Sequence, residues 1–389
     1  MKHKLKIAIY SGEIPSTTFI ERLIVGLSNK DCAILLFGRV KKAVKYNDNV
    51  IVKGYKSGRI QKGIYLLVYS FLLTFFRNKD KKKLDQLLKS QSRDSMYDKV
   101  KCYPVLWHKP DIFHIQWAKG LSEWMWVKTF GIKLVLSLRG AHINYSPIAD
   151  AKLAAMYHNH FPNVDGFHAV SKDIAKEAVK YAAHEEKIKV VYSGLNVELF
   201  TNTQKVESNQ SSVFNVISVG RPHWKKGYGY ALDAFKQLKE QNFQFKYTIV
   251  GGVNLELIYQ IKELGLENNI ISIEQVPFSE AQRLIKASDL LFLPSMEEGV
   301  ANVVLEAMAA KKIVLTTNCG GMEEAVVDGV NGFVTPIRNS HKMAEKIVEI
   351  SQISNHQKQQ ITSKALETIQ KQHTEERMVL GMLDLYNNL

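Results

Sequence analysis

The feature of this chain that most constrains its fold is a regular alternation of short apolar runs with longer amphipathic stretches. Short apolar runs predict buried strands, and apolar residues three or four positions apart predict helices. Strands that alternate with helices are typical of parallel sheets in doubly wound α/β domains. In the first half the predicted strands are Lys6–Tyr10, Cys32–Phe37, Ile112–Ile115, Lys133–Ser137, Gly166–Val170 and Lys189–Tyr192.

The second half repeats this pattern. Its predicted strands are Phe214–Val219, Lys246–Val250, Ile270–Ile273, Leu290–Leu293, Ile313–Thr316 and Gly332–Val334. The predicted helices of the chain are Phe19–Leu27, Gly229–Gln241, Leu255–Leu264, Ser279–Ala287, Val303–Ala310, His341–Ser351 and Thr374–Asn388. A length of 389 residues suggests two domains. We therefore predict two Rossmann-like domains that face across a cleft, residues 1–198 and 199–373, joined near the polar segment Thr201–Ser212. We expect the helix at about 374–389 to pack back onto the first domain.

The positive charge is concentrated in the first half of the chain. Residues 1–200 hold 33 Lys and Arg against 17 Asp and Glu, whereas residues 201–389 hold 19 against 21. A basic half suits anionic lipid, nucleic acid or a phosphorylated acceptor, although an ordinary solvated surface is the alternative. We expect no nucleic acid partner, because RRM, KH and zinc signatures are absent from the sequence. Three scattered cysteines fit a reducing compartment, so we expect a cytoplasmic protein.

One segment, Gly63–Phe76, breaks the alternation with 14 almost continuously apolar residues. It is too short to span a bilayer comfortably. Lysines and arginines flank it on both sides, from Lys53 to Lys62 and from Arg77 to Lys83. Two interpretations stay open: a buried core helix, or a helix in a membrane interface whose lysines reach anionic headgroups. On the second interpretation, residues 53–83 meet an anionic membrane surface.

The strand–turn–helix unit from Leu290–Leu293 onward combines two carboxylates with an anion site. Glu298 precedes a turn at Gly299, and Glu306 lies inside the following helix, which Asn302 is predicted to cap. The N-terminus of a helix attracts anions, because its free N–H groups and its dipole point outward. A sugar nucleotide offers matching groups, with hydroxyls at both ends and a diphosphate between them.

A second loop carries cations. Arg221 and Lys226 follow the predicted strand that ends at Val219. Arg221 suits bidentate contact with a diphosphate, and Lys226 supplies a point charge. Such a loop alone is weak evidence because surface loops often contain cations, but its combination with the paired glutamates is specific.

These motifs resemble family 4 of the retaining glycosyltransferases, which have the GT-B fold. The matching segments are GR-x4-KG at Gly220–Gly227, E-x7-E at Glu298–Glu306 and GG-x2-E-x3-DG-x2-G at Gly320–Gly332. The residue sequence around Arg221 is similar to that of family members from bacterial exopolysaccharide pathways. The resemblance implies metal-independent transfer of a hexosyl group from a nucleotide-diphosphate sugar, with retained anomeric configuration. It further implies a glycan or lipid-linked acceptor, bound by the N-terminal domain at the inner face of the plasma membrane during surface polysaccharide synthesis.

The resemblance also implies roles for individual residues. Arg221 and Lys226 would stabilise the leaving diphosphate, and Glu298 would bind hydroxyls of the transferred sugar. Glu306 would bind the nucleotide ribose. The remaining donor-binding residues would be Gly12 and Gly220, which let the backbone approach, and Val300, Ala301 and Asn302, which offer N–H groups. No cofactor and no metal ion are expected beside the donor, and the chain lacks an Asp-x-Asp motif.

The chain departs from the family pattern after the strand Lys133–Ser137, where Arg139 takes the place of a common histidine. Arg139 would contact acceptor or phosphate, or else form a structural ion pair. His142 would line the cleft, or else lie solvated in the loop. Three tryptophans nearby would stack on sugar rings or pack in the core: Trp117, Trp124 and Trp126. A catalytically silent sugar-nucleotide-binding protein and a related phosphorylase or epimerase stay open as alternatives, as does the nucleotide base.

Overall fold

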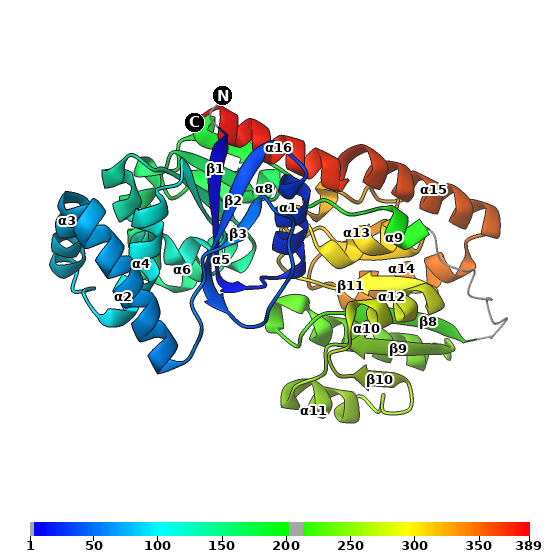
Figure 1. Cartoon of the computed structure of the whole chain (residues 1–389). Helices are drawn as coiled ribbons and strands as arrows, with labels where there is room; N and C mark the ends of the chain where they lie inside the picture. The colour runs from blue at the N-terminus through cyan, green and yellow to red at the C-terminus, as the bar shows by residue number, and fades with distance from the viewer. Residues whose placement is uncertain (1–3, 202–212) are drawn as a thin grey trace. The chain divides into compact units, whose positions relative to one another are not determined.

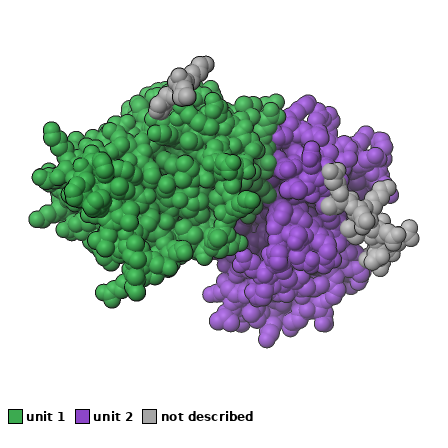
Figure 2. Space-filling view, in the orientation of Figure 1, with its two compact units in different colours: residues 1–170, 174–194, 375–389 green, residues 171–173, 195–374 purple. Residues whose placement is uncertain are grey.

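The computed structural model describes residues 4–201 and 213–389. The chain divides into two compact units, coloured separately in Figure 2. Unit 1 comprises residues 1–170, 174–194 and 375–389, and unit 2 comprises residues 171–173 and 195–374. The predicted polar linker lies, from residue 202 onward, outside the described residues.

Unit 1 is built on a seven-stranded parallel sheet in the order β3-β2-β1-β4-β5-β6-β7 (Figure 1). Its strands are β1 Leu5–Ile14, β2 Cys32–Val40, β3 Val50–Val52, β4 Ile112–Ile115, β5 Lys133–Leu138, β6 Gly166–Ala169 and β7 Ile188–Val190. The sequence prediction missed β3, a three-residue edge strand whose Ile51 and Val52 are exposed. It also ended β1 too early, because the strand continues past a bulge between Tyr10 and Gly12. Gly12 has a φ of +88°, which this bulge requires and glycine adopts readily.

Helices cover both faces of this sheet. They are α1 Thr18–Ser28, α2 Arg59–Phe76, α3 Asn78–Ser90, α4 Met96–His108, α5 Ala141–Asn144, α6 Ser146–Ala149, α7 Ala151–His160, α8 Lys172–Val179 and α16 Glu375–Asn387. Alternate residues of the strands enter two separate cores, since successive side chains point to opposite faces. Ala8 and Phe113 pack with α2, α3, α4 and α7, whereas Ile7 and Ile112 pack with α1 and α16. The C-terminal helix α16 lies against α1, β6 and β7 within unit 1.

Unit 2 contains a six-stranded parallel sheet in the order β10-β9-β8-β11-β12-β13. Its strands are β8 Phe214–Val219, β9 Phe245–Val250, β10 Ile270–Ile273, β11 Leu290–Leu293, β12 Ile313–Thr317 and β13 Phe333–Thr335. Its helices are α9 Glu198–Thr201, α10 Tyr228–Glu240, α11 Leu255–Glu263, α12 Phe278–Ala287, α13 Asn302–Ala309, α14 Ser340–Gln352 and α15 Asn355–Gln372. The sequence prediction missed α15, a largely polar helix that buries little more than the stripe Ile361, Ala365 and Ile369.

Both sheets have the strand order of doubly wound α/β domains, so the predicted fold class is confirmed. In unit 2 the order reverses between β8 and β11, and in unit 1 it reverses between β1 and β4. Ligands of such sheets bind outside the carboxyl ends of the strands at this reversal. We therefore expect a ligand site at the loops that follow β8 and β11, which carry the predicted motifs.

Helix α2 contains the apolar segment 63–76, and its interpretation as a buried core helix is wrong. Of its 18 residues only Tyr69 and Leu73 are buried. The helix packs through one side against α3 and α4 (Figure 1), and this contact leaves a row of apolar side chains exposed on the other side. Among the described residues, no helix combines the length and the apolar character needed to cross a membrane.

The three tryptophans have different surroundings. Trp124 and Trp126 are buried in the core of unit 1, where they pack against each other and Trp124 contacts Phe113. Their interpretation as sugar-stacking residues is therefore wrong. Trp117 is half-buried, and its ring lies 5.3 Å from the ring of His142.

Candidate functional site

The loops that follow β8 and β11 meet through a pair of charged side chains. Lys226 Nζ lies 2.6 Å from Glu298 Oε1, although the two residues are 72 positions apart in the sequence. Ser295 Oγ donates a second hydrogen bond to Glu298 Oε1, at 3.1 Å. The side chains of Lys226 and Glu298 are only 16% and 13% exposed, so water screens the pair weakly. The structure thus joins the cation motif and the first glutamate at the sheet reversal.

Two glycines fix the segment Pro294–Glu298 from either side. Gly227 has a φ of +67°, and a Cβ atom there would lie 1.9 Å from the carbonyl oxygen of Pro294. Gly320 has a φ of +50°, and a Cβ atom there would lie 1.9 Å from the carbonyl oxygen of Glu298. Only glycine combines this backbone conformation with such close approach. The glycines of the two flanking motifs therefore set the position of Glu298.

Glu306 lies inside α13, with its side chain directed at α12. Gln282 Nε2 of α12 donates a hydrogen bond to Glu306 Oε2 at 3.1 Å, and both side chains are largely buried. Within the described part of the chain, the Gln282 Oε1 atom is buried without a hydrogen-bond partner. Sequence reasoning missed Gln282, because it belongs to no motif. The available signal was a polar residue on the apolar face of α12, between Phe278 and Ile285.

The N-terminus of α13 differs from the prediction. The helix begins at Asn302 with Ala301 in the capping position, so the predicted Asn302 cap is wrong. Asn302 Oδ1 is instead buried without a partner among the described residues. The Ala301 N–H is engaged, since it lies 3.3 Å from Met322 Sδ. Across residues 4–201 and 213–389 no acceptor is recorded for the N–H groups of Val300 and Asn302, which stay available at the positive end of the helix.

The loop after β8 carries several positive charges. Arg221 is exposed, and none of the described carboxylates forms an ion pair with it. Burial lowers the pKa of His223, and the charges of Arg221, Lys225 and Lys226 lower it further. A protonated His223 would add a fourth positive charge, which explains the direction of this shift. The loop is therefore suited to an anion.

Tyr228, the first residue of α10, is a further member of this site that sequence reasoning missed. Its hydroxyl donates a hydrogen bond to the carbonyl oxygen of Gly220 at 2.8 Å. Burial and the nearby Glu298 carboxylate raise its pKa, so the hydroxyl stays protonated. A Cβ atom on Gly220 would lie 3.2 Å from the Tyr228 hydroxyl and from Lys226 Cε. Gly220 thus provides room for the two side chains that shape the loop.

In unit 1, the residues predicted near the acceptor lie at the carboxyl ends of β4 and β5. Arg139 Nη2 donates a hydrogen bond to Gln116 Oε1 at 3.2 Å, and its guanidinium lies 4.7 Å from the centre of the Phe19 ring. The alternative of a structural ion pair is wrong, since no carboxylate in the described ranges pairs with Arg139. Burial lowers the pKa of Arg139 to about 10. His142 is half-buried against Trp117 and so is not a solvated loop residue.

A row of buried polar groups lies beneath Arg139 and connects three strands with the C-terminal helix. His114 of β4 contacts Tyr386 Oη at 2.7 Å and Ser137 Oγ at 2.8 Å. Ser137 Oγ also contacts His168 Nδ1 at 2.9 Å, and His168 Nε2 contacts the Val191 carbonyl oxygen at 2.9 Å. Burial lowers the pKa of both histidines, to about 3 for His168, so both rings are neutral. Sequence reasoning did not anticipate this row.

Comparison with known proteins identifies two domains of one enzyme class. Residues 200–366 match the family model "Glycosyl transferases group 1", and residues 105–199 match "Glycosyltransferase Family 4". The chain is 30% identical over 175 residues to the amylovoran biosynthesis glycosyltransferase AmsK of Erwinia amylovora, covering 43% of this chain and 42% of that protein. It is 28% identical over 189 residues to the putative colanic acid biosynthesis glycosyltransferase WcaL of Salmonella typhimurium, covering 46% and 47%. The chain spans about half the length of the curated relatives it matches.

Solved structures extend the likeness to the whole chain. The Anabaena protein HepE, determined in complex with UDP and glucose, aligns over 99% of this chain and 100% of its own. The TM-score is 0.73 at 19% sequence identity, a level at which the likeness establishes the fold. Residues 105–199 thus match a family 4 glycosyltransferase domain and residues 200–366 a group 1 domain, and the chain as a whole has the fold of the GT-B proteins.

Proposed function

Since residues 105–366 match two glycosyltransferase family models and the chain has the GT-B fold, we propose that it is a metal-independent, retaining hexosyltransferase of bacterial surface polysaccharide synthesis. The donor would be a nucleotide-diphosphate sugar, and the acceptor a lipid-linked or glycan hydroxyl. The observation that carries this proposal is the Lys226–Glu298 pair, held by Gly227 and Gly320 at the sheet reversal. The match to exopolysaccharide glycosyltransferases supports the pathway.

The donor would lie across the loops after β8 and β11. Arg221, Lys226 and the free N–H groups at the start of α13 would contact the diphosphate, and Glu306 would contact the ribose. HepE, of the same fold, was solved with UDP and glucose, which supports a donor of this class. Gln282 would hold the Glu306 carboxylate in a single orientation through its hydrogen bond.

The reaction would break the bond between the anomeric carbon and the β-phosphate oxygen. The developing negative charge falls on the diphosphate, where Arg221 and Lys226 would stabilise it. An acceptor hydroxyl oxygen would then bond to the anomeric carbon from the same face, and its proton would pass to the departing phosphate. Glu298 would bind sugar hydroxyls and hold Lys226 in place, and the 2.6 Å contact between the two residues supports the second role.

We further propose that unit 1 associates peripherally with the inner face of the plasma membrane. Apolar side chains on one side of α2 are largely exposed: Leu67 70%, Phe71 58% and Phe75 69%. Arg77 caps the end of α2, and lysines follow in α3. An exposed apolar row with neighbouring cations is typical of helices in the interface of anionic bilayers.

A donor screen tests the proposed activity. Thermal unfolding of the full chain is measured with UDP-, GDP- and ADP-sugars, because a ligand at 100 times its Kd stabilises the folded state by about 2.7 kcal/mol. Release of nucleoside diphosphate from the stabilising donor is then compared between Glu298→Gln and the neighbouring control Glu297→Gln. We expect release to fall about 100-fold in the first and little in the second. No stabilisation by any donor, or equal effects of both substitutions, contradicts the proposal, and an inverted anomeric product contradicts its retaining part.

A further inference from the structure

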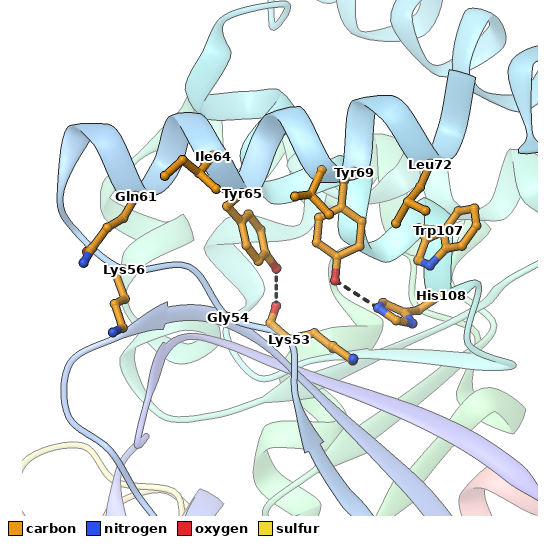
Figure 3. A pocket seen from close by; sticks show the side chains of 11 residues that line it. Lys53, Gly54, Lys56, Gln61, Ile64, Tyr65, Tyr69, Leu72, Trp107 and His108 are labelled. Carbon is orange, nitrogen blue, oxygen red and sulfur yellow. Dashed lines mark hydrogen bonds between the residues drawn. The ribbon is translucent and has the colours of Figure 1, made fainter. Parts of the chain in front are cut away.

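A cavity of about 580 Å³ lies beneath α2 in unit 1, and none of the site residues discussed above lines it. Ile64 and Leu72 of α2 lie on one wall and Trp107 of α4 lies at one end (Figure 3). Val68 of α2 also lines the cavity. The volume falls in the range of small-molecule sites, about 300–1,000 Å³. The walls named here are hydrocarbon or indole, so the cavity favours an apolar occupant.

The two tyrosine hydroxyls and the histidine of the cavity lining already have partners. The Tyr65 hydroxyl donates a hydrogen bond to the Lys53 carbonyl oxygen at 2.7 Å, and the Tyr69 hydroxyl lies 3.0 Å from His108 Nε2, as Figure 3 shows. Burial lowers the pKa of His108 to about 4, with further lowering by Lys53 and other cations, so the ring is neutral. The tyrosines thus offer ring faces to an occupant, which again suits a hydrocarbon chain.

The cavity borders the exposed apolar row of α2. Ile64 and Val68 line the cavity and are nevertheless 58% and 50% exposed, so they form its rim. Leu67 and Phe71 lie beside this rim on the same helix and belong to the exposed row, outside the cavity. A chain that left a bilayer in contact with Leu67 and Phe71 could therefore enter the cavity over Ile64 and Val68.

Two lysines of the cavity lining belong to a stretch of sequence rich in positive charge. The sequence contains no Asp or Glu from Asn49 to Lys79, whereas it contains six lysines and arginines there. Lys53 and Lys56 line the cavity, and within the described ranges neither forms an ion pair. A ligand that complements both the lining and the charge has an apolar chain and an anionic head. A single lipid phosphate has this chemistry.

We propose that this cavity holds the hydrocarbon chain of the lipid-linked acceptor, with the lipid phosphate against Lys53 and Lys56. The inference rests on the proposed function, which supplies an acceptor of this kind. It adds a separate lipid-binding site in unit 1 to the donor site in unit 2, and it distinguishes one bound lipid from general contact with a bilayer.

Calorimetric titration of the full chain with octyl, decyl and dodecyl phosphate below their micelle concentrations tests this site. We expect saturable one-to-one binding, with affinity rising about fourfold per added methylene until the cavity is full. Inorganic phosphate should not bind measurably, which would show that binding requires the hydrocarbon chain as well as the phosphate. Lys53→Gln combined with Lys56→Gln should weaken decyl phosphate at least fivefold and leave decanol affinity unchanged.

Two neighbouring tryptophan substitutions provide a matched comparison. Val68→Trp fills the cavity, whereas Leu67→Trp adds the same side chain one position away, outside the lining. We expect decyl phosphate to bind at least tenfold more weakly to the first variant and within twofold of the unchanged protein to the second. Absence of one-to-one binding, or equal weakening in both variants, overturns the inference and leaves α2 as a bilayer contact only. If Val68→Trp does not fold, the titration of the double variant Lys53→Gln and Lys56→Gln with decyl phosphate and decanol still tests the inference.

The titration contains no sugar nucleotide, so its result is independent of the proposed activity. Decyl phosphate binding at this cavity without any sugar transfer would support the lipid site and contradict the proposed function. Sugar transfer to a lipid-linked acceptor with an acceptor KM that Val68→Trp leaves unchanged would support the function and overturn the lipid site.

Discussion

Replacing Gly227 with alanine tests whether glycine geometry sets the contact between Lys226 and Glu298. The new Cβ would start 1.9 Å from the Pro294 carbonyl oxygen, whereas real Cβ atoms essentially never come closer than 3.0 Å. One of the two loops must therefore move by at least about 1.1 Å. Lys226 precedes Gly227 and Glu298 follows Pro294, so the shift acts on the 2.6 Å contact between them. A misplacement of about 1 Å costs roughly 100-fold in rate, which is the expected fall in kcat/KM.

Gly329→Ala is the matched control for this substitution. Gly329 lies in the same unit with a φ of +71°, close to the +67° of Gly227, but no atom lies within 4 Å of its Cβ position. Both variants bear the same strain of a left-handed alanine, about 1–2 kcal/mol. Gly227→Ala should lose about 1–3 kcal/mol more by overpacking, which lowers its unfolding midpoint several degrees below that of the control.

Nucleotide release and thermal unfolding of the two variants, with the donor found in the screen, measure these differences. Values of kcat/KM within threefold of each other would refute the reasoning, because both variants carry the same backbone strain. A lower unfolding midpoint with unchanged kcat/KM would show that the loop relaxes without moving Glu298, and it would equally refute the link between glycine and catalysis.

Three further results are expected. Lys226→Met or Arg221→Met should lower kcat about 10²–10³-fold, or roughly 3–4 kcal/mol in the barrier, since each would remove a charge from the leaving diphosphate; steady-state kinetics measures this. Gln282→Leu should weaken nucleoside diphosphate binding about tenfold by calorimetry, because Glu306 loses its hydrogen bond. The pKa of His168 is about 3 in the folded chain and near 6.5 in the unfolded chain. Between these two pH values only the unfolded chain therefore takes up a proton at this ring. Lowering the pH from 6.5 to 4.5 should therefore cost about 2–3 kcal/mol of stability in urea titrations, and His168→Asn should remove this contribution.

Most of the unit 2 fold was predictable, because its strands are continuous apolar runs between turn residues. The predicted bounds of β8, β10 and β11 agree with the structure, β9 and β12 differ by one residue at one end, and β13 is shifted by one residue at both ends. Helix α15 was not predictable in the same way, since its buried stripe is narrow and its remaining residues are polar. Burial against α13 stabilises it, and a single sequence does not contain that information.

The candidate site was predictable only where a motif fixed it. Spacing suggested that the cation loop and the paired glutamates belong together, but the contact between Lys226 and Glu298 depends on two sheet strands being neighbours. Gln282 could not be found from spacing, because its role arises from the packing of α12 beside α13. The Asn302 cap was a sound local expectation that failed because the helix begins one residue earlier.

The uneven charge of the chain has a specific structural location. From Lys53 to Lys89 the sequence holds ten lysines and arginines against two aspartates, a net charge of +8 within 37 residues. These residues belong to α2, α3 and the loop before them, around the exposed apolar row. Residues 201–389 carry a net charge of −2 and yet contain the cationic loop of Arg221 and Lys226. The proposed bilayer contact thus coincides with a high local net charge, whereas the proposed diphosphate site would need only two or three cations that the fold brings together.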